Sequence, residues 1–163
     1  MNKSLLVVLA IGLITSRGAA GQTQRASIQG VWQVVQVTVT GPDARTINPT
    51  QPNLTIFTGR HYSRVEVHSD GPRLVPVDIA KASGDELRAA WGPFVGEAGT
   101  YEATEGNVMT LRPVAAKNPS VTAPGSFITY SYRVDGDTLW VTQQRNQNGP
   151  FANPVTIKAV RVE

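Results

Sequence analysis

The residues of this chain best suited to chemistry lie close together, between positions 62 and 68. Tyr62, Arg64, Glu66 and His68 occupy every second position, so on a β-strand all four side chains point to one face. A carboxylate beside an imidazole can carry out general acid–base catalysis or provide two metal ligands. The same row is also typical of a solvated strand face that makes cross-strand ion pairs, and this is the interpretation we prefer.

The rest of the sequence adds little to a catalytic interpretation. His61, the only other histidine, is seven residues from His68, so the two point to opposite faces and cannot share a metal ion directly. The absence of cysteine excludes disulfides, thiolate zinc sites and thiol nucleophiles. The sequence also lacks a Gly-x-Ser-x-Gly motif, a phosphate loop and a dinucleotide glycine motif. We therefore predict no catalytic residue, no metal site and no cofactor.

Aromatic side chains give a better indication of a binding cavity. Tyr130 and Tyr132 share a face of one predicted strand, and Trp140 lies on the next strand, across a turn. Such side chains can line an apolar pocket, with hydroxyl groups that orient a ligand. The candidate pocket residues are Phe57, Tyr62, Trp91, Tyr101, Tyr130, Tyr132 and Trp140. For each of them, ordinary packing in the core or on the surface is the alternative.

These residues belong to segments that predict β-strands. Apolar and β-branched residues alternate with polar ones and are interrupted by turns, of which Asp135-Gly136 is the strongest hairpin signal. The predicted strands are 31–39, 54–57, 61–67, 99–103, 107–111, 127–134, 138–144 and 155–162. Eight sequential strands favour an all-β fold, an antiparallel up-and-down barrel, because closure removes both sheet edges. A two-sheet sandwich is the alternative.

One segment predicts a short helix, near residues 84–91. Ser83 and Glu86 are spaced as a capping box, and Gly92-Pro93 ends the helix. Two turns of helix are unstable alone, so its apolar face, with Leu87 and Trp91, needs something to pack against. At the open end of a barrel the helix would be either a lid or a permanent plug, and the sequence leaves both open.

The N-terminus predicts a signal peptide, residues 1–21. Lys3 precedes an apolar run of ten residues, 5–14, and small residues at 18–21 allow cleavage after Ala20 or Gly21. The run is too short to span a bilayer, which takes about twenty residues. We therefore expect an exported protein, periplasmic or secreted, with one domain at 22–163.

Charge and hydropathy exclude two classes of partner. The chain of 163 residues has a formal net charge of +3, but removing the leader takes away Lys3 and Arg17 and leaves 13 basic and 12 acidic side chains. No cluster of Lys and Arg remains to follow a phosphate backbone, so a nucleic-acid partner is not expected. No other apolar stretch reaches membrane length, so we expect no integral membrane segment in the mature chain.

Several short motifs carry a family resemblance. They cover most of the mature chain and are Gly30-Val31-Trp32 with Arg161, Phe57-Thr58-Gly59-Arg60-His61-Tyr62-Ser63, Ala90-Trp91-Gly92-Pro93-Phe94, Gly99-Thr100-Tyr101-Glu102, Leu111-Arg112-Pro113, Lys117-Asn118-Pro119 and Gly136-Asp137-Thr138-Leu139-Trp140. With these motifs the chain resembles the bacterial lipocalin-like domain family. The resemblance implies a small barrel that binds an apolar molecule, and it implies no catalytic residues. The chain departs from true lipocalins in having no disulfide and no Thr-Asp-Tyr motif, because Thr129-Tyr130 lacks the acid.

In a lipocalin-like barrel, Trp32 and Arg161 have a structural role. Trp32 is expected to plug the barrel base rather than to form a pocket wall. Arg161 either stacks on the Trp32 indole in a cation–π contact, closing the barrel, or is an exposed terminal arginine.

Three functions remain open. The first is an exported barrel that binds a small apolar or aromatic molecule in its interior. The second is a structural or interaction protein with a filled barrel and an exposed apolar patch. The third, which we expect least, is an isomerase, cyclase or hydrolase in which Glu66, His68 or a tyrosine converge inside a pocket. Oligomeric state is left open.

Overall fold

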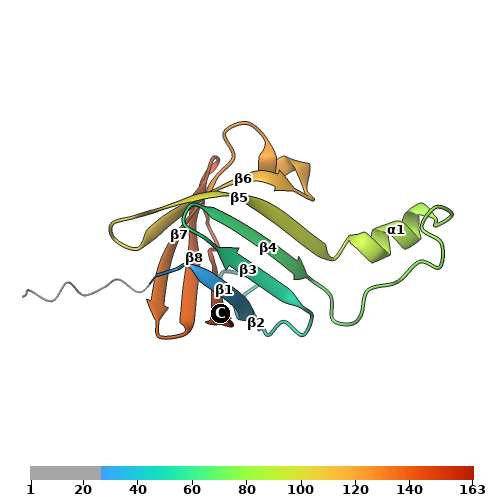
Figure 1. The fold of residues 1–163 in the computed structure, drawn as a ribbon, viewed down its shortest axis with the longest axis horizontal. Coiled ribbons are helices and arrows are strands. Elements are labelled where there is room, and N and C mark those ends of the chain that lie inside the picture. Colours follow the sequence, from blue (N-terminus) through green and yellow to red (C-terminus); the bar gives the residue numbers. More distant parts are fainter. Residues whose placement is uncertain (1–26) are drawn as a thin grey trace, which may run out of the picture.

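The computed structural model describes residues 27–163, which form a closed barrel of eight antiparallel strands (Figure 1). The barrel strands are β1 (Gly30–Val39), β3 (Asn53–Phe57), β4 (His61–Val67), β5 (Phe94–Thr104), β6 (Val108–Ala116), β7 (Ile128–Asp135), β8 (Thr138–Asn146) and β10 (Val155–Arg161). Two short strands, β2 (Arg45–Ile47) and β9 (Gly149–Pro150), pair with β1 and β8. A single short α-helix, α1 (Gly84–Trp91), and a 3-10 turn, η1 (Pro119–Thr122), complete the described part. The prediction of an all-β up-and-down barrel is confirmed.

Closure comes from the last strand, β10. It pairs with β1 on one side, where Trp32 lies opposite Arg161, and with β8 on the other, where Ala159 lies opposite Leu139. Each of the other barrel strands pairs with its neighbours in chain order. The barrel therefore has no free edge among its eight strands. Closure matters physically because an open edge would expose unpaired backbone N–H and C=O groups.

Strands β5 and β6 are longer than the sequence indicates, because the predicted 99–103 and 107–111 leave out the far half of each. The additional segments contain glycine, alanine and proline, residues with weak strand preference, but they pair with each other and β5 also pairs with β4. A bulge between Ala98 and Gly99 adjusts the register. A Cβ at Gly99 would overlap the backbone of Arg112, so this close approach requires glycine.

The core fills one half of the barrel. Alternating inward-facing side chains from all eight barrel strands, together with Ile28, meet there in one cluster. Its members are Ile28, Trp32, Phe57, Tyr62, Tyr101, Met109, Leu111, Tyr130, Leu139, Val141 and Ala159. We call this half, where β1 begins and β10 ends, the closed end, and the opposite half, where β3 begins and β4 ends, the mouth.

Helix α1 extends away from the barrel (Figure 1). Its predicted capping box is present: Ser83 Oγ accepts from the Glu86 amide at 3.2 Å, and the Ser83 amide donates to the Glu86 carboxylate at 2.8 Å. The Ser83 amide and hydroxyl both donate to the Glu86 carboxylate, and these two hydrogen bonds lower the pKa of Glu86. Ala90 is the one buried residue of the helix, while Trp91 is 50% exposed and packs edge-on against Phe94. The helix is thus anchored at its C-terminal end and does not plug the barrel.

The predicted signal peptide, residues 1–21, lies outside the described residues. Within residues 27–163, no helix combines the length and the apolar character needed to span a bilayer.

Candidate functional site

The closed end is sealed by Trp32 and Arg161. The Trp32 side chain has no solvent exposure, and its indole N–H donates to the Ile28 carbonyl at 2.7 Å. The Arg161 guanidinium lies over the indole, with Cζ 4.2 Å from the ring centroid. It also donates to the carbonyls of Gln29 at 2.7 Å and Ser27 at 3.0 Å. The indole is therefore a plug, held in place by a chain segment that crosses the barrel end.

Gly30 is required by the same arrangement. Its φ of +136° lies in a region that L side chains rarely adopt, and a Cβ there would overlap Arg161 Nη1 and the Glu163 carbonyl. The guanidinium occupies the space that a side chain at position 30 would need. This explains why a glycine precedes the plugging indole by two residues.

The barrel behind the plug is nearly full. Its interior cavity measures about 50 Å³ and is lined by core side chains together with Arg64 and Glu66. Small-molecule sites are usually about 300–1,000 Å³. The closed half therefore has no room for a ligand unless the core rearranges.

The aromatic candidates separate into two groups. Phe57, Tyr62, Tyr101 and Tyr130 are buried in one cluster, and Tyr132 packs against it. Of these, Phe57, Tyr62 and Tyr130 line the small interior cavity. The Tyr101 hydroxyl donates to the Thr58 carbonyl at 2.6 Å, which ties it to the turn between β3 and β4.

Two tryptophans lie apart from this cluster. The β7–β8 register places Trp140 opposite Arg133 and Tyr132 opposite Val141, so Trp140 points to the outer face of the barrel. There its ring lies 3.8 Å from Arg133 Cζ and 5.9 Å from Lys158 Nζ. Trp91 is exposed on α1. The structure therefore does not bring either tryptophan to the interior with the tyrosines.

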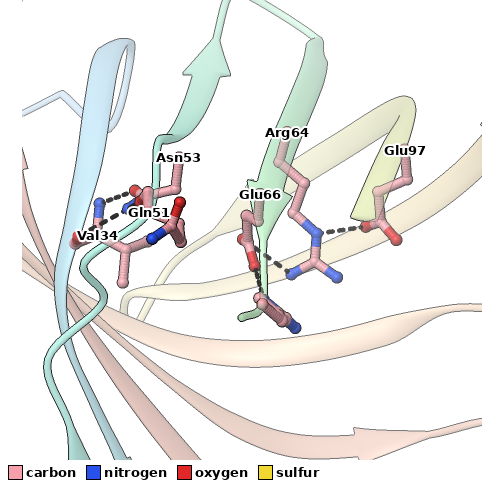
Figure 2. Close-up of polar contacts among 7 residues, drawn as sticks. Val34, Gln51, Asn53, Arg64, Glu66 and Glu97 are labelled. Carbon is pink, nitrogen blue, oxygen red and sulfur yellow. Dashed lines mark hydrogen bonds and ion pairs between the residues drawn. The ribbon is translucent and has the colours of Figure 1, made fainter. Parts of the chain in front are cut away.

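The row of polar residues on β4 faces into the barrel. Figure 2 shows Arg64 between Glu66, on its own strand, and Glu97 on β5. Arg64 Nε lies 3.2 Å from Glu97 Oε1, whereas Arg64 Nη1 lies 3.8 Å from Glu66 Oε1. The Tyr62 hydroxyl donates to Glu97 Oε1 at 3.1 Å. The cross-strand ion pair is as predicted, but the predicted solvated face is wrong, because the side chains of Glu66 and Glu97 are only 12% and 9% exposed.

Burial and charge shift the acid–base properties of this cluster. Burial raises the pKa of Tyr62, and the neighbouring Glu97 carboxylate raises it further. Burial alone would lower the pKa of Arg64, but the carboxylates of Glu66 and Glu97 outweigh it, so this pKa lies above its ordinary value. Burial also raises the pKa of Tyr130. At neutral pH the tyrosines are therefore hydrogen-bond donors, and Arg64 is a fixed positive charge.

His68 completes the row at the rim of the mouth. Its Nε2 lies 2.6 Å from Glu66 Oε2, and its side chain is 63% exposed. An ionised carboxylate only accepts hydrogen bonds, so Nε2 is the donor. Glu66 and His68 thus meet as an acid–base catalyst requires, but the imidazole is mostly in solvent. Within residues 27–163, no group of three His, Asp or Glu side chains is placed to hold a metal ion.

A larger pocket opens at the mouth. It has a volume of about 640 Å³, within the usual range of small-molecule sites. Its lining residues are Val34, Val37, Arg45, Ile47, Asn48, Pro49, Thr50, Asn53, Glu66, Val67, His68, Ser69 and Asp70. Val34 and Glu66 line both this mouth pocket and the interior cavity, so the two spaces meet at these side chains.

Asn53 shapes the mouth pocket, and sequence reasoning missed it. Strand β1 pairs with β3 only as far as Trp32, and it has a bulge between Val34 and Gln36. The buried Asn53 side chain accepts from the Val34 amide at 2.6 Å and donates to the Val34 carbonyl at 3.1 Å (Figure 2). It thereby satisfies both backbone groups where the ladder opens.

Glu97 was also missed, because its segment was not predicted as a strand. The signal was present in part: Glu97, Gly99 and Tyr101 alternate along one face, and Tyr101 was a pocket candidate.

Comparison with protein-family models gives no match, and neither does comparison with curated proteins. The family resemblance therefore stays a prediction.

Proposed function

We propose that this protein is a lipocalin-like binding barrel whose ligand, a small and largely apolar or aromatic molecule, occupies the mouth pocket. The observation that carries this proposal is the contrast in free volume: about 640 Å³ at the mouth against about 50 Å³ in the interior. The closed eight-stranded barrel and the motif resemblance support it. The ligand then sits nearer the rim than the interior site that the sequence suggested.

The walls of the mouth pocket fit such a ligand. Val37, Ile47 and Pro49 supply apolar surface, and Asn53 and Glu66 supply polar groups at one side. Polar groups at one side of a pocket fix a ligand's orientation, while burial of its apolar body against the apolar residues provides most of the affinity. The adjoining cavity has space for no more than a small terminal group.

A direct test combines native mass spectrometry with a dye. We expect either a co-purified small molecule on the purified protein or binding of the neutral dye Nile red, read by its fluorescence. Ile47→Asp places a charge on the pocket wall and should weaken dye binding about tenfold, the loss expected for one apolar contact. Val114→Asp, at an exposed position outside the pocket, is the matched control. Absence of both a co-purified molecule and dye binding would contradict the proposal, as would equal binding by the two variants.

We also propose export, which residues 1–21 support by their composition. Expression in a Gram-negative host should yield a periplasmic protein that begins at Gly21 or Gln22. Intact-mass measurement of the protein from the periplasmic fraction checks this, and a cytoplasmic protein that retains the leader would contradict it.

A second candidate function is an interaction module, favoured by one specific observation. The connection between β4 and α1 exposes Leu74, Val75, Val77 and Ile79 to solvent. If these side chains bind a protein partner, Val75→Asp with Val77→Asp should change the oligomeric state or complex formation in analytical ultracentrifugation and leave Nile red binding unchanged. An unchanged sedimentation profile with intact dye binding favours the binding barrel.

A further inference from the structure

We infer that the ligand of the mouth pocket carries a positively charged group, such as a protonated amine, and that Glu66 binds it. This inference rests on the proposed binding function and specifies its ligand as an amphiphilic cation. Three observations carry it: the charges around Glu66, the small number of hydrogen bonds that its carboxylate accepts, and its position between the mouth pocket and the interior cavity.

Acidic side chains outnumber basic ones around Arg64 inside the barrel. Two carboxylates, Glu66 and Glu97, lie beside one guanidinium, Arg64. Glu97 is the better partnered of the two, with Arg64 Nε at 3.2 Å and the Tyr62 hydroxyl at 3.1 Å. Arg64 Nη1 is 3.8 Å from Glu66, beyond hydrogen-bond distance. With histidine counted as neutral, these three side chains carry one excess negative charge, and Glu66 is the carboxylate of the two that borders the mouth pocket.

Glu66 has few hydrogen-bond partners. Within residues 27–163 its carboxylate accepts one hydrogen bond, from His68, although two carboxylate oxygens offer about four acceptor sites. Its side chain is 12% exposed, so little water compensates. A buried carboxylate is costly unless it is paired and hydrogen-bonded. A cationic donor that enters the pocket would supply both.

Glu66 is also accessible from the mouth pocket. Glu66 lies where the mouth pocket meets the interior cavity, so a molecule in the pocket reaches it directly. Arg45 and Asp70 on the pocket lining are opposite in sign, so with His68 counted as neutral the lining keeps the negative charge of Glu66. The apolar body of the ligand would then lie against Ile47 and Pro49. An anionic head group in the same place would face the uncompensated carboxylate.

The experiment uses three probes with one apolar body and different head groups: 4-phenylbutylamine, 4-phenylbutanol and 4-phenylbutanoate. Their affinities for the purified full chain are measured at neutral pH by NMR titration. We expect the amine to bind about tenfold or more tightly than the alcohol, the gain typical of a charge-assisted hydrogen bond, and the carboxylate to bind weakest. Glu66→Gln keeps the shape and removes the charge, so it should abolish the preference for the amine. Glu102→Gln, at an exposed carboxylate on β5, should retain it.

Each outcome decides something. Equal binding of amine and alcohol, or tighter binding of the carboxylate, overturns the inferred charge and leaves the binding function intact. Binding of none of the probes at millimolar concentration overturns both this inference and the mouth pocket as a site for such molecules. A preference for the amine that persists in Glu66→Gln overturns the assignment to Glu66. The wild-type series decides the sign of the charge, so the test does not depend on any variant folding.

Discussion

The two ends of this barrel are built from the same strands, but they differ in how fully their polar side chains are hydrogen-bonded. At the closed end, the Trp32 indole N–H and the Arg161 guanidinium are each bound to backbone carbonyls of the segment that crosses the end. At the mouth, Glu66 accepts one hydrogen bond within the described residues, from a histidine at the rim, and borders a pocket of about 640 Å³. The polar groups of the closed end thus have hydrogen-bond partners within the barrel. At the mouth, the Glu66 carboxylate can accept further hydrogen bonds and borders a pocket with room for a ligand.

This difference separates the end expected to determine stability from the end where we propose that a ligand binds. Substitutions at the closed end should change the free energy of unfolding, because its contacts are made within the chain. Neutral substitutions at the rim of the mouth should change binding and leave the fold intact.

The largest effect is expected at the plug. Trp32→Ala removes a fully buried indole and its hydrogen bond, and should lower the free energy of unfolding by about 3–5 kcal/mol. Trp91→Ala, at a half-exposed tryptophan of α1, should cost less than about 0.5 kcal/mol. Urea denaturation of both variants provides the comparison. Similar losses in the two would show that the closed end is not the stabilising half.

The next effect tests the buried charges of the mouth. Arg64→Met leaves Glu66 and Glu97 without their shared cation and should cost about 2–3 kcal/mol, less than for a fully buried pair because Arg64 is partly exposed. The exposed pair of Arg88 with Asp85 is the control, and Arg88→Met should cost under about 1 kcal/mol. The measurement is again the free energy of unfolding in urea. A neutral or stabilising Arg64→Met would mean that the carboxylates do not need the guanidinium.

A smaller loss is expected where the backbone makes room for Arg161. Gly30→Ala forces a Cβ into the guanidinium at a strained φ and should cost about 1–2 kcal/mol. Gly59→Ala, whose added Cβ would meet no atom within 4 Å, is the matched substitution. Thermal unfolding followed by circular dichroism compares them. If position 30 tolerates alanine as well as position 59 does, Arg161 is not confined as described.

The smallest effect is a pH dependence at the border between the two ends. The pKa of Tyr62 is raised in the folded state, so its contribution to stability is complete below about pH 10 and is lost as pH rises towards the folded pKa. At pH 10.5 the loss should be about 0.8 kcal/mol for this residue. In Tyr62→Phe, the free energy of unfolding should therefore fall by about 0.8 kcal/mol less between pH 8 and 10.5 than in the wild type. Lysine titration is common to both proteins and cancels in the difference. Parallel profiles for wild type and variant would contradict the prediction.

Much of the fold could be predicted because its signals are local. The Asp135-Gly136 turn and the Ser83–Glu86 capping box depend on neighbouring residues and appear as expected. The outward position of Trp140 could also have been derived, since Asp135 pairs with Thr138 and the register then places Trp140 opposite Arg133. The far halves of β5 and β6 could not, because their weak strand-forming residues pair only when partner strands are already in place.

The candidate site was only half predictable for a related reason. Alternation correctly placed Tyr62, Arg64, Glu66 and His68 on one face, but it could not tell whether that face looked into the barrel or into solvent. Glu97 reaches Arg64, and Asn53 reaches Val34, from other strands, and these partners are 33 and 19 positions away in the chain. Contacts of this range are set by strand register and bulges rather than by local pattern.

The kind of protein follows from local features of the amino-acid sequence: short alternating strands and tight turns favour a closed antiparallel barrel, and the capping box predicts one short helix. These features depend on backbone preferences that act over a few residues. The arrangement of the strands in space, which local sequence does not reveal, leaves the barrel filled at one end and open at the other and places Glu66 beside the mouth pocket. Those properties arise from how eight strands close on one another, because closure alone determines which side chains share the limited interior volume.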